Sequence, residues 1–189
     1  MNDRPSNSGR VIGETLLLFS LLAAALWLFT WNNEFPSTLH ADEGGKVDFI
    51  LKNRPPDFHH PLLLIQTGRL IQTVTNWPGV EGAARAGRWG SAMAGVLLLL
   101  GFYFWVRRPL GAGWALVGTA ILAMMPLLAV HAHYVKEDVM LTAAIVAVVV
   151  ALRCWRENDE LWTLMLLGAA LGMAAASHYK SVLMLVIMA

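Results

Sequence analysis

Two pairs of neighbouring acidic residues lie beside long apolar stretches of this chain. The first pair, Asp42 and Glu43, falls in residues 39–63, LHADEGGKVDFILKNRPPDFHHPLL, which hold four acids, three bases and three histidines. The second pair is Glu137 and Asp138. Acids near a membrane boundary are costly to desolvate, so they are functional more often than idle. Carboxylates and nearby cations offer two kinds of chemistry, proton abstraction from a hydroxyl and binding of an anion.

Each acidic pair also has a simpler interpretation. Asp42 and Lys46 are four residues apart and would pair on the surface of a helix. Glu137 and Asp138 would lie in a solvated loop, with Lys136 offsetting part of their charge. The functional interpretation requires more, because both pairs must then meet at one side of a membrane.

The candidate anion-binding residues are spread along the chain. Arginine can grip a phosphate through a bidentate fork, and histidine can donate to a phosphate or a sugar. The alternatives are snorkelling for the cations and a structural loop role for the histidines. The candidates are Arg85, Arg88, Lys180, His59 and His60.

A metal site is left open by the sequence. His131 and His133 form an HxH pattern close to Glu137 and Asp138, which is a weak zinc signal because spacing fixes no further ligands. The single cysteine, Cys154, cannot form an internal disulfide. A divalent metal therefore stays an open cofactor, and no ligand set is predicted.

The composition requires lipid as a solvent. The 189 residues are 57% hydrophobic and only 14% charged, with a mean hydropathy of +0.54, whereas soluble domains carry roughly 25% charge. The net charge of +1 argues against a nucleic-acid partner. Membrane lipid is accordingly an expected partner.

The uncharged stretches predict an all-α, polytopic membrane protein with about five spans in a single module, residues 1–189. A spanning helix needs about 20 apolar residues. The fourth stretch has only 14 uncharged residues, about 21 Å of helix, so its flanking charges must snorkel or face a wet cavity. The predicted spans are residues 12–32, 89–106, 110–130, 138–155 and 161–179, with an external loop at 33–88.

The external loop should contain interfacial helices. A short helix carrying Val47 and Ile50 is expected to end before Pro55, and a second one should cover residues 62–77. Trp77 and Trp89 suit the aromatic belt of a membrane interface.

Positive charges predict the orientation. Arginines precede the first span and occupy the two turns at residues 107–108 and 153–156, all on one side. The positive-inside rule makes that side cytoplasmic. We therefore expect a multi-pass protein of the cell (inner) membrane with a cytoplasmic N-terminus.

The order of motifs resembles a known family. HADE follows the first span, HHPLLL opens an interfacial helix, RAGRWGSAMAGVLLLLGFYFWVRRPLG leads into a basic turn, HAHYVKEDVMLTAAIVAVVVAL joins two spans, and GAALGMAAASHYKS closes the fifth. This pattern is similar to the N-terminal membrane module of the GT-C glycosyltransferases. The likeness is greatest to the group of protein mannosyltransferases, aminoarabinose transferases and RgtA/B/C/D-like proteins.

The resemblance implies transfer of a sugar from a polyprenyl-phosphate donor to an acceptor on the extracytoplasmic side. By position, Asp42 matches the family's base and Glu43 would position the acceptor or share that role. Asp138 would orient the acceptor or a metal. The substrate-binding residues would be Glu137, His59, His60, Arg88 and Lys180.

Family members continue through further spans, so the chain is expected to be a truncated GT-C module that need not be active alone. Two other classes stay open, a fragment of a transporter and a non-catalytic helical subunit of a membrane complex. A transporter should carry its charges near the middle of the membrane on broken helices. A non-catalytic subunit would not need two acidic sites on one side.

Overall fold

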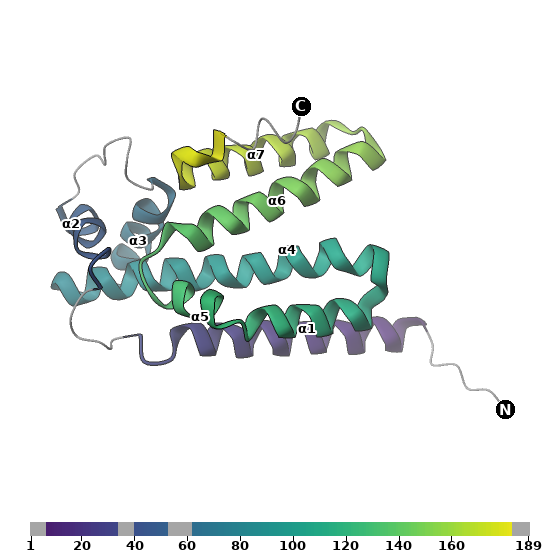
Figure 1. Cartoon of the computed structure of the whole chain (residues 1–189), viewed down its shortest axis with the longest axis horizontal. Coiled ribbons are helices and arrows are strands. Elements are labelled where there is room, and N and C mark those ends of the chain that lie inside the picture. Colours follow the sequence, from purple (N-terminus) through teal and green to yellow (C-terminus); the bar gives the residue numbers. More distant parts are fainter. Residues whose placement is uncertain (1–6, 34–39, 53–61, 183–189) are drawn as a thin grey trace.

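The computed structural model describes residues 7–33, 40–52 and 62–182, and all regular elements in these ranges are helices. The long helices lie side by side in one bundle (Figure 1). In chain order the elements are α1 (Asn7–Thr30), α2 (Gly44–Lys52), α3 (Leu62–Thr75), α4 (Gly79–Ala123), α5 (Pro126–His133), α6 (Glu137–Asn158), α7 (Leu161–Ser177) and the 3₁₀ helix η1 (Tyr179–Val182). The prediction of an all-α helical membrane protein is confirmed.

Helix α4 folds back on itself instead of running straight. Gly111 has φ 79° and ψ 169°, a backbone conformation that favours glycine, and Pro109 lies two residues before it. The chain reverses direction there (Figure 1). A Cβ on Gly118 would lie 3.4 Å from the ring of Phe102, so the two arms of α4 are in contact. One 45-residue helix therefore supplies two passes through the bundle.

In the part of the chain that the structure describes, three helices are long and apolar enough to cross a membrane, at Ser8–Thr30, Gly79–Ala123 and Glu137–Asn158, and α7 is a shorter apolar helix. Because α4 doubles back, the predicted spans at residues 12–32, 89–106, 138–155 and 161–179 fall on α1, the first arm of α4, α6 and α7. The predicted span at residues 110–130 is interrupted: it falls on the second arm of α4 and on α5, which are separated at Met124 and Met125 because Pro126 cannot continue the helical hydrogen bonding. Many large apolar side chains on these helices are exposed, such as Phe19 (71%) and Trp114 (69%), as expected of surfaces that face lipid.

Helix α6 solves the length problem of the fourth predicted span. Its 22 residues are about 33 Å long, enough for a hydrocarbon core of roughly 30 Å. The helix reaches this length by extending beyond the uncharged stretch at both ends. Glu137 and Asp138 occupy its first turn, where the helix dipole favours negative charge, and Arg156 occupies its last turn.

The interfacial elements pack against the first turns of α4. Gly87 lets α4 approach its neighbours closely, because an added Cβ would lie 2.9 Å from Val135 and 3.1 Å from Ile50. Leu64 and Ile65 of α3 and Phe29 of α1 are fully buried in the same core. This packing holds α2, α3 and the connection between α5 and α6 against one end of the bundle.

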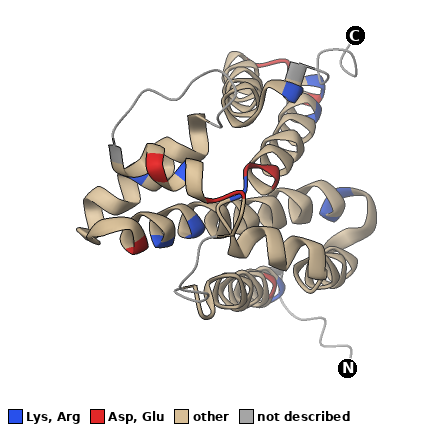
Figure 2. Cartoon of the chain, turned by 60° about the vertical axis from the view of Figure 1, so that its left-hand side comes forward, with Lys and Arg blue, Asp and Glu red and all other residues tan. Residues whose placement is uncertain are grey.

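The bundle has two chemically different ends. We call one the polar end; it is formed by α2, α3, the start of α4, the α5–α6 connection and the end of α7 (Figure 1). Figure 2 shows acidic and basic positions close together in the centre of this end, where the connections meet. We call the other the arginine end; it is formed by the bend of α4 and the α6–α7 connection, with Arg107, Arg108 and Arg153 nearby.

Candidate functional site

The candidate site begins in a tight turn before α2. The backbone N–H of His40 donates to Glu43 Oε2 (2.9 Å), and the Glu43 N–H donates to the His40 carbonyl (2.8 Å). The two bonds close the turn formed by HADE, and two glycines then open α2. This reciprocal pairing points the side chain of Glu43 inward and leaves that of Asp42 outside, 52% exposed.

Glu43 and Arg88 form a buried ion pair at the centre of the polar end. Their residues are 0% and 2% exposed, and the guanidinium grips the carboxylate in a fork, with Nε–Oε1 at 3.0 Å and Nη2–Oε2 at 2.8 Å. The Val135 N–H also donates to Oε1 (2.8 Å), and Arg88 Nη1 donates to the Asn33 carbonyl (2.8 Å). The pair therefore joins the end of α1, the start of α2, helix α4 and the α5–α6 connection.

Opposing effects determine the pKa of Glu43. Burial by itself raises this pKa, but the hydrogen bonds from Arg88 and from the backbone N–H groups of Val135 and His40 outweigh it and lower the pKa below its ordinary value. Glu43 is therefore a carboxylate whose acceptor capacity is used inside the protein. This geometry suits a positioning role for Glu43 and Arg88 better than direct contact with a substrate.

Asp42 is the exposed acid of the first pair. Its carboxylate forms an ion pair with Lys136, whose backbone is held by Ser91 through bonds of 3.1 Å and 3.3 Å. The hydrogen bond and the positive charge of Lys136 lower the pKa of Asp42, and the hydrogen bond to Asp42 raises the pKa of Lys136. Asp42 thus presents an ionised carboxylate at the surface of the polar end.

The second acidic pair divides in the same way. Glu137 is 20% exposed and forms an ion pair with the buried Lys46, whose Nζ also donates to the Val135 carbonyl (3.2 Å). Asp138 is 55% exposed, with Oδ2 4.0 Å from His131 Nδ1. Each pair therefore has one acid engaged within the polar end and one acid directed outward.

Two lysines connect the acidic pairs across the chain. Lys46 from α2 reaches Glu137, and Lys136 from the α5–α6 connection reaches Asp42. This exchange holds the two acidic pairs at the same end of the bundle. From the sequence, both lysines were predicted only as local partners of nearby acids. Each lysine lies close in sequence to acidic residues, and this was the signal by which its role in the site could have been predicted.

Aromatic side chains line the same region. The rings of His40 and Tyr134 lie 4.9 Å apart, and the guanidinium of Arg88 lies 5.9 Å from the Tyr134 ring. Arg85 lies over the ring of Trp77 at 4.3 Å, a cation–π contact that gives this arginine a partner within the protein. Arg69, which was not predicted as a site residue, donates to the Phe49 carbonyl from two nitrogens and holds the end of α2.

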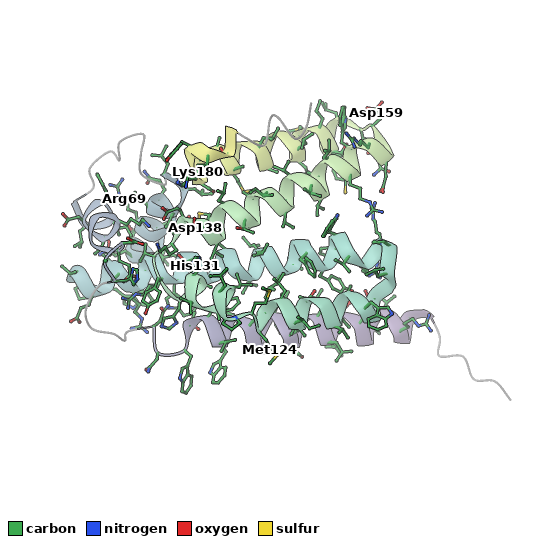
Figure 3. The ribbon with its side chains drawn as sticks, in the orientation of Figure 1. Arg69, Met124, His131, Asp138, Asp159 and Lys180 are labelled. Carbon is green, nitrogen blue, oxygen red and sulfur yellow. The ribbon has the colours of Figure 1, made fainter. Side chains whose placement is uncertain are left out.

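Figure 3 shows that Lys180, Asp138, His131 and Arg69 lie at the polar end, whereas Asp159 lies at the other end. Lys180 is exposed on η1, and its N–H donates to His178 Nδ1 (3.0 Å). The two remaining candidates, His59 and His60, lie outside the described residues.

The possible metal ligands do not gather in the described part of the chain. Within residues 7–33, 40–52 and 62–182, no group of three or more His, Cys, Asp or Glu side chains could hold a metal ion. His133 Nδ1 lies 3.3 Å from the Phe29 carbonyl, and Glu137 is paired with Lys46. Of the four residues of the weak zinc signal, His131 and Asp138 lie 4.0 Å apart, whereas His133 and Glu137 have other partners.

Comparison with known proteins relates the chain to a family. A family model described as dolichyl-phosphate-mannose-protein mannosyltransferase matches residues 68–189, well over half of the chain. Arg88, Lys136, Asp138 and Lys180 lie inside the matched range, whereas Asp42 and Glu43 precede it. No curated protein and no solved structure matches the chain.

Proposed function

Since the chain belongs to the dolichyl-phosphate-mannose-protein mannosyltransferase family of membrane glycosyltransferases, we propose that it acts in the transfer of a sugar from a polyprenyl-phosphate donor to an acceptor hydroxyl. The observation that carries this proposal is the ionised, exposed carboxylate of Asp42, held by Lys136 beside Asp138 at one end of a helical membrane bundle. A donor that is anchored in lipid brings its sugar to that position.

The proposed reaction is a displacement at the anomeric carbon of the sugar. The acceptor oxygen forms a bond to that carbon, the bond from the carbon to the donor phosphate oxygen breaks, and the electron pair leaves with the polyprenyl phosphate. The hydroxyl proton passes to Asp42, which is the general base. Asp138, exposed and near His131, orients the acceptor.

The leaving polyprenyl phosphate gains negative charge and needs cations or hydrogen-bond donors. Among the described residues, Lys180 is the candidate to bind this phosphate, since it is exposed at the polar end. His59 and His60 complete this group in the proposal. Glu43 and Arg88 act through the backbone that they hold, and Glu137 acts through Lys46, so we assign these three residues positioning roles.

The proposal also includes an orientation. The arginine end is cytoplasmic by the positive-inside rule, so the polar end faces the extracytoplasmic side of the cell membrane. The donor headgroup and the acceptor then meet in the outer interface, at the level of α2 and α3.

The test is Asp42→Asn in the whole protein, reconstituted with a polyprenyl-phosphate-linked sugar. We expect release of polyprenyl phosphate to fall by about 10²–10⁴-fold, because the amide cannot accept the hydroxyl proton. The matched control is Asp159→Asn at the opposite end (Figure 3), where φ is 45° and asparagine is well tolerated. Equal activity of the two variants would contradict the assignment of Asp42.

A further inference from the structure

A long apolar groove runs between the first arm of α4 and the helices α6 and α7. Its volume is about 520 Å³, and small side chains such as Ala144, Ala147 and Gly101 form its floor. Several of its apolar walls are largely exposed, including Leu97 (61%), Phe104 (50%) and Leu166 (49%). The groove is thus a surface that fits a hydrocarbon chain and not water.

At the arginine end the groove meets a second, smaller pocket of about 270 Å³. The two pockets share Phe104, Val150 and Cys154, so the second continues the first. The other described residues that line the smaller pocket are Trp105 and three arginines, Arg107, Arg108 and Arg153, and none of the described lining side chains is acidic. An apolar slot that opens onto three guanidinium groups has the polarity of a lipid with an anionic headgroup.

The charges around the smaller pocket leave capacity to bind an anion. Arg107 pairs with Glu14, whereas Arg108 and Arg153 share the single carboxylate of Glu157. The three arginine side chains are 38–46% exposed. The phosphate of a lipid can therefore reach the pair that Glu157 bridges.

The groove is somewhat longer than one leaflet of a bilayer. Along α4 its lining runs from Gly90 to Phe104, which is about 21 Å at 1.5 Å per residue. One leaflet provides half of a hydrocarbon core of about 30 Å. A single acyl chain that starts at the arginine end therefore occupies the part of the groove within its own leaflet, about 15 Å, and the rest of the groove continues towards Leu63 and Thr67 of α3.

We propose that this groove is a binding site for an anionic phospholipid of the leaflet at the arginine end, with the lipid phosphate at Arg108 and Arg153 and one acyl chain between α4, α6 and α7. The phosphate position lies at the end of the bundle opposite the polar end, and the proposal does not depend on the proposed glycosyl transfer. Its role would be to fix the spacing of α4 and α6.

The whole protein in nanodiscs provides the test, with phosphatidylglycerol and phosphatidylcholine as probes. Cys154 lines both pockets and is the only cysteine of the chain, so its rate of alkylation by a maleimide reports occupancy. We expect phosphatidylglycerol to protect Cys154 and phosphatidylcholine not to. Arg108→Gln with Arg153→Gln should weaken phosphatidylglycerol binding by about five-fold per arginine.

Two further variants separate a specific site from general attraction to an anionic surface. Arg156→Gln removes a charge at the same end that does not line the pocket, and should leave the protection unchanged. Glu157→Gln removes the carboxylate that competes for Arg108 and Arg153, and should tighten binding. Ala147→Leu fills the groove and should abolish protection while the arginines remain.

The proposal is overturned if phosphatidylcholine protects Cys154 equally, or if Glu157→Gln weakens the protection. It is also overturned if inorganic phosphate alone protects as well as the lipid, because the site would then bind a free anion. Folding of each variant is checked by helical circular dichroism in the same nanodiscs.

Discussion

Each of the two acidic pairs at the polar end has one acid that holds the structure and one that is exposed. Glu43 and Glu137 are engaged by Arg88 and Lys46, whereas Asp42 and Asp138 are more than half exposed. An acid that accepts four hydrogen bonds inside the protein has little capacity left for a substrate. An exposed acid beside a lysine stays ionised and can accept a proton.

Lys136→Met should shift the acidic limb of the pH–activity profile to higher pH. Lys136 lowers the pKa of Asp42 below its ordinary value of 3.8, so the base form persists below that pH in the native protein. Without the lysine the pKa of Asp42 returns towards its ordinary value, and activity is lost at a higher pH. The measurement is release of polyprenyl phosphate between about pH 3 and pH 7. Lys136→Arg keeps the charge and should leave the limb in place.

Glu43→Gln should destabilise the protein by about 3–5 kcal/mol, because the buried charge of Arg88 loses its partner. Adding Arg88→Met should recover part of this loss, since no buried charge then remains. The pKa of Glu43 is lower in the folded state than its ordinary value of 4.5. The contribution of this carboxylate to stability is therefore complete above pH 4.5 and is lost as the pH falls through the folded-state pKa. Thermal unfolding in detergent checks both effects, and a double variant less stable than Glu43→Gln would contradict this account.

At the level of elements, periodicity and apolar length predicted the helices well. Residues 62–77 were expected to be helical, and α3 covers Leu62–Thr75. Two features were not predictable in the same way. A basic turn was expected at residues 107–108, but the helical backbone continues through these residues almost to the reversal at Gly111. The inward direction of Glu43 depends on Arg88, 45 residues away, and no local pattern encodes such a contact.

Gly87→Ala should loosen the polar end. The new Cβ would lie 2.9 Å from both methyl groups of Val135, the residue whose N–H binds Glu43. Overpacking of this kind costs about 1–3 kcal/mol. Gly90→Ala, one turn along the same helix, meets Thr67 at an ordinary 3.4 Å and serves as the control. The temperature of thermal unfolding and the rate of donor turnover should both fall for Gly87→Ala only. Equal values for the two variants would contradict this role of Val135.

At the scale of the whole molecule, the chemistry is distributed by end. The polar end carries the two acidic pairs, the lysine exchange and the interfacial helices. The arginine end carries the basic turns, with Glu14 and Glu157 as their partners (Figures 1 and 2). An apolar bundle with exposed large side chains separates them. The sequence order of charges predicted this separation, because alternating spans bring every second connection to the same side. Which acid at the polar end faces outward required the folded contacts.

The orientation can be measured with single cysteines in a Cys154→Ser background. Glu81 is exposed in the first turn of α4 at the polar end, and Asp159 is exposed at the arginine end. In the proposed orientation, with the arginine end cytoplasmic, a membrane-impermeant maleimide added to sealed cells should label Glu81→Cys and spare Asp159→Cys. Permeabilisation should then make both residues reactive, which controls for accessibility. Labelling of Asp159→Cys alone in sealed cells would place the polar end in the cytoplasm, where an extracytoplasmic acceptor could not reach Asp42.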